Sequence, residues 1–210
     1  RARMVEQGLD ALVSDDPAKA LGQAQGGGLI GSQLLRAIGT PAQTVDLVSP
    51  YFVPTPQGVQ AFAHLRAQGI RVRILTNALE ATDVAVVHAG YATYRKPLLA
   101  QGVELYEMRR QAPDYAQDEE RERLKLSPLG SSGSSLHAKT FAVDGQRAFV
   151  GSFNFDPRSL LLNTEMGLVV ESPALAQAIS QSFDAHIPER AYRLSLHADG
   201  RLRWHSGVGN

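Results

Sequence analysis

Apolar residues along the chain follow two alternating patterns. Short apolar runs with the two-residue period of β-strands are separated by segments in which apolar residues recur every three or four positions, as in helices. The predicted strands cover residues 44–49, 71–76, 103–108, 136–143, 147–151, 166–170, 192–196 and 201–204. The predicted helices cover residues 30–38, 56–68 and 82–101, and a further helix begins after Ser172. This order of elements predicts one α/β domain in which a mixed β-sheet is sandwiched between helices.

Residues 44–76 predict a parallel pair of strands, because strand, helix and strand follow one another directly. Active sites in such sheets lie beyond the carboxyl ends of the strands. Tyr51, Phe52 and Asn77 should therefore lie near the mouth of a site. Tyr51 and Phe52 are interpreted first as packing residues, and contact with a substrate at the rim of the site is the alternative. Pro97 is expected to kink or restart the helix over 82–101.

Two segments lack either pattern. Residues 1–28 are polar and alanine-rich and end in three glycines, which predicts a linker or N-terminal extension before a domain over 29–210. Residues 109–135 alternate acidic and basic side chains and end in glycine and serine, which predicts a mobile loop. The chain begins with Arg1 and not with methionine, which suggests a fragment or a processed protein whose membrane anchor or signal could lie outside it.

The composition is that of an ordinary globular protein, with 210 residues, 43% hydrophobic residues and a formal net charge of zero. The chain lacks the basic excess that binding to nucleic acid usually requires, so nucleic acid is not an expected partner. Cysteine is absent, which excludes disulfides. No uninterrupted apolar run approaches the length that spans a membrane.

Polar chemistry is concentrated in residues 136–165. An Asp144-Gly145 pair between two apolar runs predicts a β-hairpin. On an extended strand, His137 and Lys139 share one face, whereas Asp144 lies at an odd offset and at the turn. The Lys139 ammonium would repel a metal cation but suits a phosphate, so neither a metal nor a cofactor is expected.

The return strand and the next strand add further candidates. Ser152 and Asn154 lie two residues apart and would add a hydroxyl and an amide beside the predicted phosphate. Glu165, at the start of a strand, could accept a hydrogen bond from an imidazole and fix its tautomer. Asp144 is interpreted as structural, bonding to the backbone of its own turn. His88 is expected to be a packed residue of a helix, with a substrate contact as the alternative.

These residues match a known family pattern. His137, Lys139 and Asp144 match the HxKxxxxD signature of the phospholipase D superfamily, and Ser152, Asn154 and Glu165 fall where its GSxN motif and trailing acidic residue fall. More narrowly, Ser49–Pro54 (SPYFVP) and Leu160–Val170 resemble the C-terminal half of bacterial cardiolipin synthases.

The resemblance implies a phosphatidyl transfer in two steps through a phosphohistidine, with a second histidine protonating the leaving alcohol. Two HxKxxxxD motifs are then needed and this chain has one, so its partner would be a missing N-terminal half or a second copy. The resemblance makes His137 the general acid/base first and the nucleophile second, Lys139, Ser152 and Asn154 the ligands of the phosphoryl oxygens, and Glu165 the stabiliser of an imidazolium.

The resemblance also implies phospholipid substrates, cardiolipin as the product, and peripheral contact with the bacterial inner membrane. Two alternatives remain open. One is a phosphodiesterase or nuclease of the same superfamily that is completed by homodimerisation. The other is a degenerate half that only scaffolds a partner, against which the intact histidine, lysine and asparagine argue.

Overall fold

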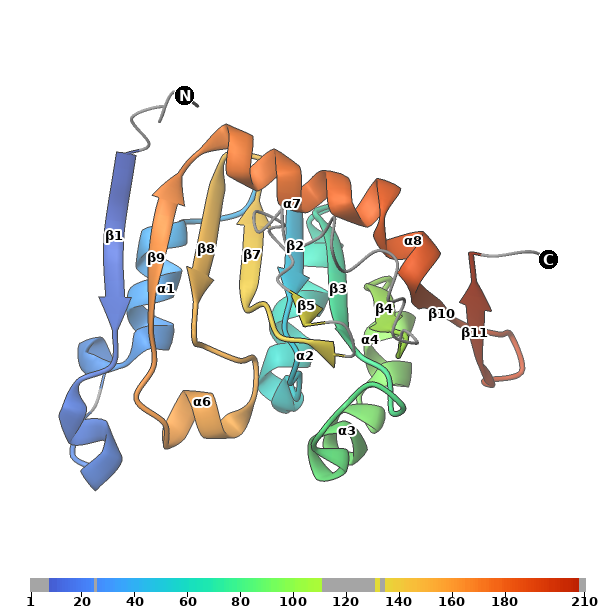
Figure 1. Cartoon of the computed structure of the whole chain (residues 1–210), viewed down its shortest axis with the longest axis horizontal. Coiled ribbons are helices and arrows are strands. Elements are labelled where there is room, and N and C mark those ends of the chain that lie inside the picture. The colour runs from blue at the N-terminus through green and yellow to red at the C-terminus, as the bar shows by residue number, and fades with distance from the viewer. Residues whose placement is uncertain (1–7, 25, 111–130, 133–134, 208–210) are drawn as a thin grey trace.

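The structure, a computed structural model, describes residues 8–24, 26–110, 131–132 and 135–207. In these residues nine strands form one mixed sheet in the order β1-β9-β8-β7-β2-β3-β4-β10-β11 (Figure 1). Their bounds are β1 Gly8–Ser14, β2 Thr44–Val48, β3 Arg71–Asn77, β4 Glu104–Met108, β7 Thr140–Val143, β8 Arg147–Gly151, β9 Met166–Glu171, β10 Ala191–Leu196 and β11 Leu202–Ser206. A separate small pair consists of β5 (Ser131–Ser132) and β6 (Ser135–Leu136).

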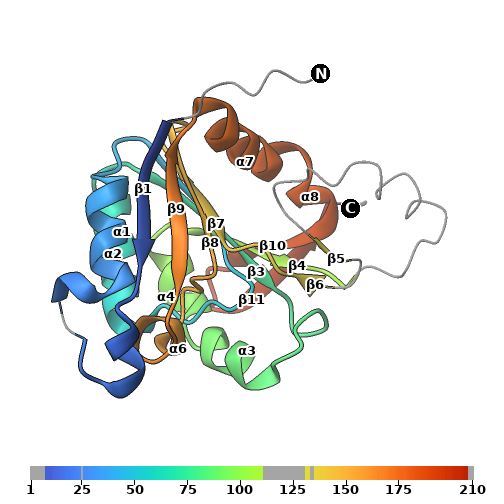
Figure 2. The same ribbon diagram turned by 60° about the vertical axis from the view of Figure 1, so that its left-hand side comes forward.

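Helices cover both faces of the sheet, as Figure 2 shows with α1 and α2 on one side and α7 on the other. The α-helices are α1 Ile30–Ile38, α2 Thr55–Ala67, α3 Ala85–Ala92, α4 Arg95–Ala100, α6 Pro157–Leu161, α7 Pro173–Ala185 and α8 Ile187–Arg190, and the 3-10 helices are η1 Pro17–Leu21 and η2 Gly26–Gly28. The predicted α/β fold with a mixed sheet between helices is therefore confirmed.

The sheet is parallel only in its middle. Strands β2, β3 and β4 run parallel to one another, and every other neighbouring pair in the sheet order is antiparallel. Apolar side chains of these strands pack against α1, α2 and α4 in the largest core cluster, which includes Ile74, Leu98 and Phe149. A smaller cluster, with Ala148 and Ile179 among its members, lies beneath α7. The strand–helix–strand unit predicted over residues 44–76 is present as β2, α2 and β3.

The N-terminal segment is not a linker where the structure describes it. Strand β1 pairs with β9 along its length, from Gly8 opposite Glu171 to Ser14 opposite Met166, and η1 and η2 follow it. Val13 is buried in the main core, so the strand contributes to packing as well as to the ladder. The apolar residues of β1 alternate as in a strand, but the alanines and glycines that follow them favour a linker in the sequence-based prediction. The structure therefore contradicts a linker over residues 8–24 and 26–28, and residues 1–7 and 25 lie outside the described part.

The motif hairpin is shorter than predicted. Strand β7 begins at Thr140 instead of residue 136, because the side chain of Asn77 holds the backbone of Leu136 on both sides. The turn contains Asp144 and Gly145, both with positive φ. His137 and Lys139 consequently lie in the connection between β6 and β7, not on a strand.

Two other expectations concern segments flanking the motif. The helical region over 82–101 breaks after Ala92 and restarts at Arg95, two residues before Pro97, so the expected restart is present. Pro97 lies in the first turn of α4, where a missing N–H costs little. Of the predicted mobile loop over 109–135, residues 111–130 and 133–134 lie outside the described residues.

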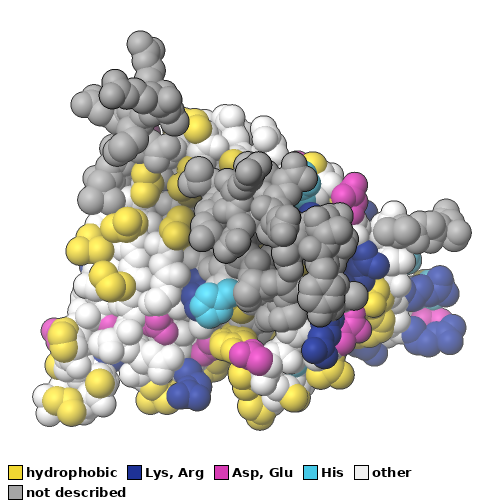
Figure 3. All heavy atoms as spheres, in the orientation of Figure 1, with side chains coloured by type: hydrophobic (Ala, Val, Ile, Leu, Met, Phe, Trp, Pro, Cys, Tyr) yellow, Lys and Arg dark blue, Asp and Glu magenta, His cyan; other side chains and the backbone are white. Residues whose placement is uncertain are grey.

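One face of the sheet carries an exposed apolar row. Leu12 on β1 is opposite Leu168 on β9, which is opposite Val150 on β8, and their exposed fractions are 58%, 40% and 47%. These side chains point away from the main core, because their neighbours Val13, Val169 and Phe149 point into it. Figure 3 shows hydrophobic side chains gathered over β1, β8 and β9.

Candidate active site

Most of the candidate residues lie on segments that meet at one end of the strands, which is the lower end of the sheet in Figure 1. The carboxyl ends of β2, β3 and β8 meet there with the start of β7 and of β9. The segments after β2 and β8 are tied together, because Ser49 Oγ accepts a hydrogen bond from Phe155 N at 3.1 Å and Phe155 O accepts one from Val53 N at 2.7 Å. The segments that carry the candidate residues thus meet beyond the carboxyl ends of the parallel strands β2 and β3, and the site itself stays a prediction.

His137 and Lys139 are adjacent at this edge. The His137 side chain is exposed, and the Lys139 ammonium donates a hydrogen bond to the His137 backbone oxygen at 3.0 Å. Burial lowers the pKa of Lys139, while the nearby carboxylates of Glu165, Asp83 and Asp156 act in the opposite direction. The ammonium is thus partly desolvated, and its charge is available to an anion that displaces its bond to the backbone.

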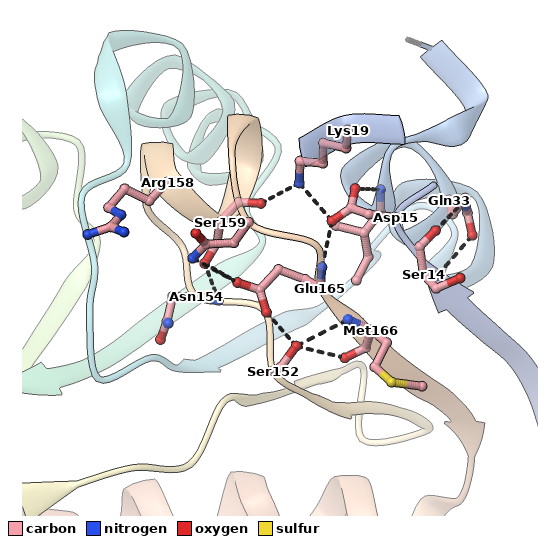
Figure 4. A network of polar contacts seen from close by, with 12 residues as sticks. Ser14, Asp15, Lys19, Gln33, Ser152, Asn154, Arg158, Ser159, Glu165 and Met166 are labelled. Carbon is pink, nitrogen blue, oxygen red and sulfur yellow. Dashed lines mark hydrogen bonds and ion pairs between the residues drawn. The ribbon is translucent and has the colours of Figure 1, made fainter. Parts of the chain in front are cut away.

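Glu165 is buried at the same edge and is held by hydroxyl groups (Figure 4). Ser152 Oγ donates to Glu165 Oε2, and Ser159 Oγ donates to Glu165 Oε1 at 2.8 Å. Asn163 Nδ2 adds a long bond of 3.4 Å. Among the described residues, none of the donors to this carboxylate is a histidine. The role expected for Glu165, orienting an imidazole, therefore remains a proposal.

Asn154 presents a buried amide at the site. Its exposed fraction is 8%, and its Oδ1 atom has no hydrogen-bond partner among the described residues. The hydroxyl of Thr140, the first residue of β7, is buried in the same way without a partner. Buried polar atoms are rarely left unpaired, so both atoms are candidates for contact with water or a ligand. The Thr140 hydroxyl can donate, whereas Asn154 Oδ1 can only accept, so a phosphoryl oxygen would have to bind the amide nitrogen of Asn154.

Asp144 lies at the other end of β7 from Lys139 and is not brought to the site. Its carboxylate accepts hydrogen bonds from the backbone amides of Ala42, Gln43 and Thr44 at 2.7–2.9 Å. The expected bonds to its own turn are replaced by bonds to the segment that leads into β2. Although it belongs to the HxKxxxxD pattern, its geometry gives it a structural contact and no contact with the catalytic candidates.

The three rim candidates differ in their surroundings. Tyr51 is half-buried and donates to Asp83 Oδ1 at 2.7 Å, and burial together with this carboxylate raises the pKa of Tyr51 to about 12. Phe52 is 1% exposed and packs against Phe62, Tyr91 and Phe155, so its side chain belongs to the core. Of the two aromatic residues, only Tyr51 can present its side chain at the rim.

His88 is also a packed residue. It is 7% exposed, its Nε2 lies 2.6 Å from a guanidinium nitrogen of Arg95, and its ring meets Tyr91 edge to face. Burial and the neighbouring Arg95 charge lower the pKa of His88. The packing interpretation of His88 fits this environment, in which Arg95 already contacts Nε2 of the imidazole.

Several residues at the site were missed from the sequence. Asp15 and Lys19 form a buried ion pair of 2.7 Å beside Glu165, and Asp156 caps α6 by accepting from Arg158 N and Ser159 N. An Asp-Pro pair before a short helix is a recognisable capping signal. The four-residue spacing of Asp15 and Lys19 is readable in the sequence, but the polar, alanine-rich composition of the segment predicts a linker.

The donor set does not resemble a metal centre. Among residues 8–24, 26–110, 131–132 and 135–207, no group of three His, Cys, Asp or Glu side chains is placed to hold a metal ion. The same part of the chain contains no helix whose length and apolarity would let it cross a membrane.

Residues 34–187 match the family described as "Cardiolipin synthase, PLD-like domain". The chain belongs to this family of phospholipase D-like proteins. It is 49% identical over 193 residues to cardiolipin synthase C of Escherichia coli (strain K12), covering 92% of the chain but 40% of that protein. It is 27% identical over 177 residues to cardiolipin synthase A of Yersinia pseudotuberculosis, covering 84% of the chain and 31% of that protein. The chain thus spans well under half of these relatives.

Solved structures share the fold. Nuc from Salmonella typhimurium, a phospholipase D family member, superimposes with a TM-score of 0.57 at 16% identity, covering 88% of this chain and 98% of that one. Phosphatidylserine synthase of Haemophilus influenzae gives a TM-score of 0.51 at 16% identity, covering 77% of this chain and 36% of that one. Both therefore support the phospholipase D fold for this chain.

Proposed function

We propose that this chain is the catalytic half of a phospholipase D-type phosphatidyltransferase, a cardiolipin synthase, that supplies one of two catalytic histidines. The observation that carries the proposal is the meeting of His137 and Lys139 with Asn154 and Glu165 at one edge of the sheet, in a chain of this family. An exposed imidazole two residues before a partly desolvated ammonium suits a phosphodiester better than it suits a neutral substrate.

The reaction proceeds in two displacements. One histidine nitrogen attacks phosphorus, a P–N bond forms, the P–O bond to the first alcohol breaks, and the second histidine protonates that alcohol. An acceptor alcohol then gives its proton to the second histidine and attacks phosphorus, which breaks the P–N bond. His137 is assigned the acid/base role, with the nucleophile as the alternative assignment.

The phosphoryl oxygens are held by Lys139 and Asn154, whose charge and amide can stabilise the transition state. Ser152 is expected to join them, but the acceptors of its hydroxyl in this structure are Glu165 Oε2 and, at 3.3 Å, Met166 O. We therefore assign Ser152 to holding Glu165 until a ligand displaces that bond. Glu165 in turn stabilises the positive charge at the site, including an imidazolium formed during proton transfer.

The second catalytic histidine comes from another phospholipase D half. The other histidines of the chain are His64, His88, His186, His197 and His205, and none has a lysine two residues later. The exposed row of Leu12, Val150 and Leu168 offers a surface for that half, because isolated domains rarely expose adjoining apolar side chains on three strands. The greater length of the relatives favours a half within the same polypeptide over a second copy.

The substrates are phospholipids, and the site works at the bacterial inner membrane through peripheral contact. Segments around the site edge carry exposed aliphatic residues: Leu79 after β3, Val86 on α3, Leu161 on α6 and Leu162 after it, each more than 60% exposed. Figure 1 places α3 and α6 beyond the same end of the sheet. Such side chains can enter the lipid surface while the site faces the headgroups.

The test uses two proteins, the 210-residue chain alone and the full-length protein that carries it. The full-length protein should transfer phosphatidyl groups between phospholipids in vesicles, whereas the isolated chain should be folded and inactive. The isolated chain should still bind inorganic phosphate weakly, with chemical-shift changes at Lys139 and Asn154 that Lys139→Met removes. Turnover of a phosphodiester by the monomeric chain would overturn the proposal. Activity that follows a concentration-dependent dimer and acts on DNA would favour the nuclease alternative.

A further inference from the structure

Asp15, the residue after β1, makes hydrogen bonds to both the backbone nitrogen and the backbone oxygen of Glu165. Asp15 Oδ2 accepts a hydrogen bond from Glu165 N at 2.9 Å, and Asp15 N donates one to Glu165 O at 2.8 Å. The other carboxylate oxygen, Oδ1, accepts from Ile30 N at the start of α1 at 2.8 Å. Both peptide groups of Glu165 are therefore tied to a residue 150 positions earlier.

Lys19 holds the neighbouring part of the same loop. Its ammonium is 2.7 Å from Asp15 Oδ2 and donates to Ser159 O at 2.7 Å, and its side chain is 2% exposed. Ser159 in turn donates its hydroxyl to Glu165 Oε1. As Figure 4 shows, the ion pair contacts Glu165 by two routes, one through its backbone and one through the serine that holds its carboxylate.

Stability alone does not explain why Asp15 and Lys19 form a buried ion pair at this position. Removing two charges from water costs several kcal/mol, and a well-packed apolar pair of similar volume is often as stable. An apolar pair would keep the backbone bond from Asp15 N to Glu165 O, but it could not reproduce the three side-chain bonds that Asp15 and Lys19 make to Glu165 N, Ile30 N and Ser159 O. The geometry of the loop that carries Glu165 therefore depends on this pair.

We propose that Asp15 and Lys19 are positioning residues that fix Glu165 for catalysis, so that the N-terminal strand completes the active site. The inference rests on the proposed function, since it assumes that Glu165 acts in the reaction. Neither residue touches the substrate, so their loss should lower kcat and leave KM nearly unchanged.

The chain provides a matched control in a second buried ion pair. Arg73 and Asp46 are 2.5 Å apart, and their side chains are 3% and 0% exposed. This pair joins β2 and β3 to α7 through Asp184 and Ser180 O, and makes no bond to the loop of Glu165. A variant of this pair reports the general cost of disturbing buried charges.

The experiment is a double-mutant cycle in the full-length enzyme, with kcat measured well below the Tm of each variant. Asp15→Asn offers one oxygen for two backbone donors and should lower kcat about 10- to 100-fold through misplacement of Glu165. In a Glu165→Gln background the same change should have no further effect, because the residue through which it acts is already altered. Asp46→Asn should lower Tm while kcat stays within about twofold in both backgrounds.

Two results would overturn the proposal. One is that Asp15→Asn lowers kcat by the same factor with and without Glu165→Gln. The other is that Asp46→Asn lowers kcat as much as Asp15→Asn does. If Asp15→Asn does not fold, the kcat comparison with and without Glu165→Gln is made with Lys19→Met and with the double variant Asp15→Asn/Lys19→Met, which removes both charges. The positioning can also be measured without turnover, by hydrogen exchange at the Glu165 amide. Lys19→Met should speed that exchange while Asp46→Asn does not, and this outcome separates failure of the inference from failure of the proposed activity.

Discussion

Asp144 Oδ1 lies 2.9 Å from the backbone nitrogen of Thr44, a residue 100 positions earlier in the chain. Thr44 begins β2, and the bond lies where β2 and β7 start their antiparallel pairing at Val45 and Val143. Asp144 therefore joins the turn of the motif hairpin to the parallel part of the sheet, at the end remote from the candidate active site.

Replacing Asp144 should affect stability more than chemistry. Asp144→Ala removes three acceptor bonds to backbone amides, and we expect it to lower the free energy of unfolding by about 1–3 kcal/mol. Asp199→Ala is the control, because Asp199 lies in the turn between β10 and β11 and bonds only locally, to Arg201 and His197. Denaturant unfolding and turnover of the folded variant decide the matter. An inactive Asp144→Ala protein of unchanged stability would give Asp144 a role in the reaction.

Loss of His137 should abolish turnover without unfolding the protein. Its side chain is exposed, so His137→Ala creates no cavity, but it removes a proton-transfer group worth about 100- to 10,000-fold in rate. His64→Ala, at an exposed position of α2, is the matched control and should keep full activity. A phospholipid-transfer assay on the full-length enzyme measures both. Near-normal activity of His137→Ala would show that another residue acts.

Acid should destabilise the protein partly through His88. Its pKa is lowered by burial and by Arg95, so the unfolded chain binds a proton more readily than the folded protein does. Stability from this source is full above the ordinary histidine pKa of about 6.5 and is lost as the pH falls through that value toward the folded pKa. Urea unfolding at pH 7.5 and pH 5.0 should show a smaller fall in unfolding free energy for His88→Gln than for the unaltered protein. Equal falls would contradict the proposed effect of burial.

Activity should survive removal of divalent cations. The phosphate is assigned to the ammonium of Lys139 and the amide of Asn154, and an ammonium at the phosphate position disfavours a metal ion beside it. Phosphatidyl transfer measured in EDTA should equal that in buffer alone. A complete loss in EDTA that added Mg²⁺ or Zn²⁺ restores would require a metal in the reaction.

Much of the fold was accessible from the sequence because it depends on local patterns. The hairpin turn, the strand–helix–strand unit and the Ser172 cap, whose hydroxyl accepts from Leu175 N, are each specified by neighbouring residues. The break before β7 was not accessible, because it depends on bonds between Asn77 and Leu136 that form only after folding.

The same distinction applies to the site. His137, Lys139 and Asn154 could be proposed from their spacing, and they lie at one edge of the sheet. The contacts of Asp15 with Glu165 and of Lys19 with Ser159 could not, because they join residues 150 and 140 positions apart and start in a segment whose composition predicts a linker. Asp144 illustrates the reverse case, in which a motif position contacts a distant backbone and not the site.

The outermost strands of the sheet lie beyond the span that the family comparison recognises. That span, residues 34–187, contains neither β1 nor β10 and β11, which pair with β9 and β4. A protein cut to these boundaries would leave β9 and β4 as its edge strands, and the backbone groups that pair with β1 and β10 in the whole sheet could then pair with other chains and aggregate. The span of the family match is therefore narrower than the sheet, and protein production should be planned around the complete sheet.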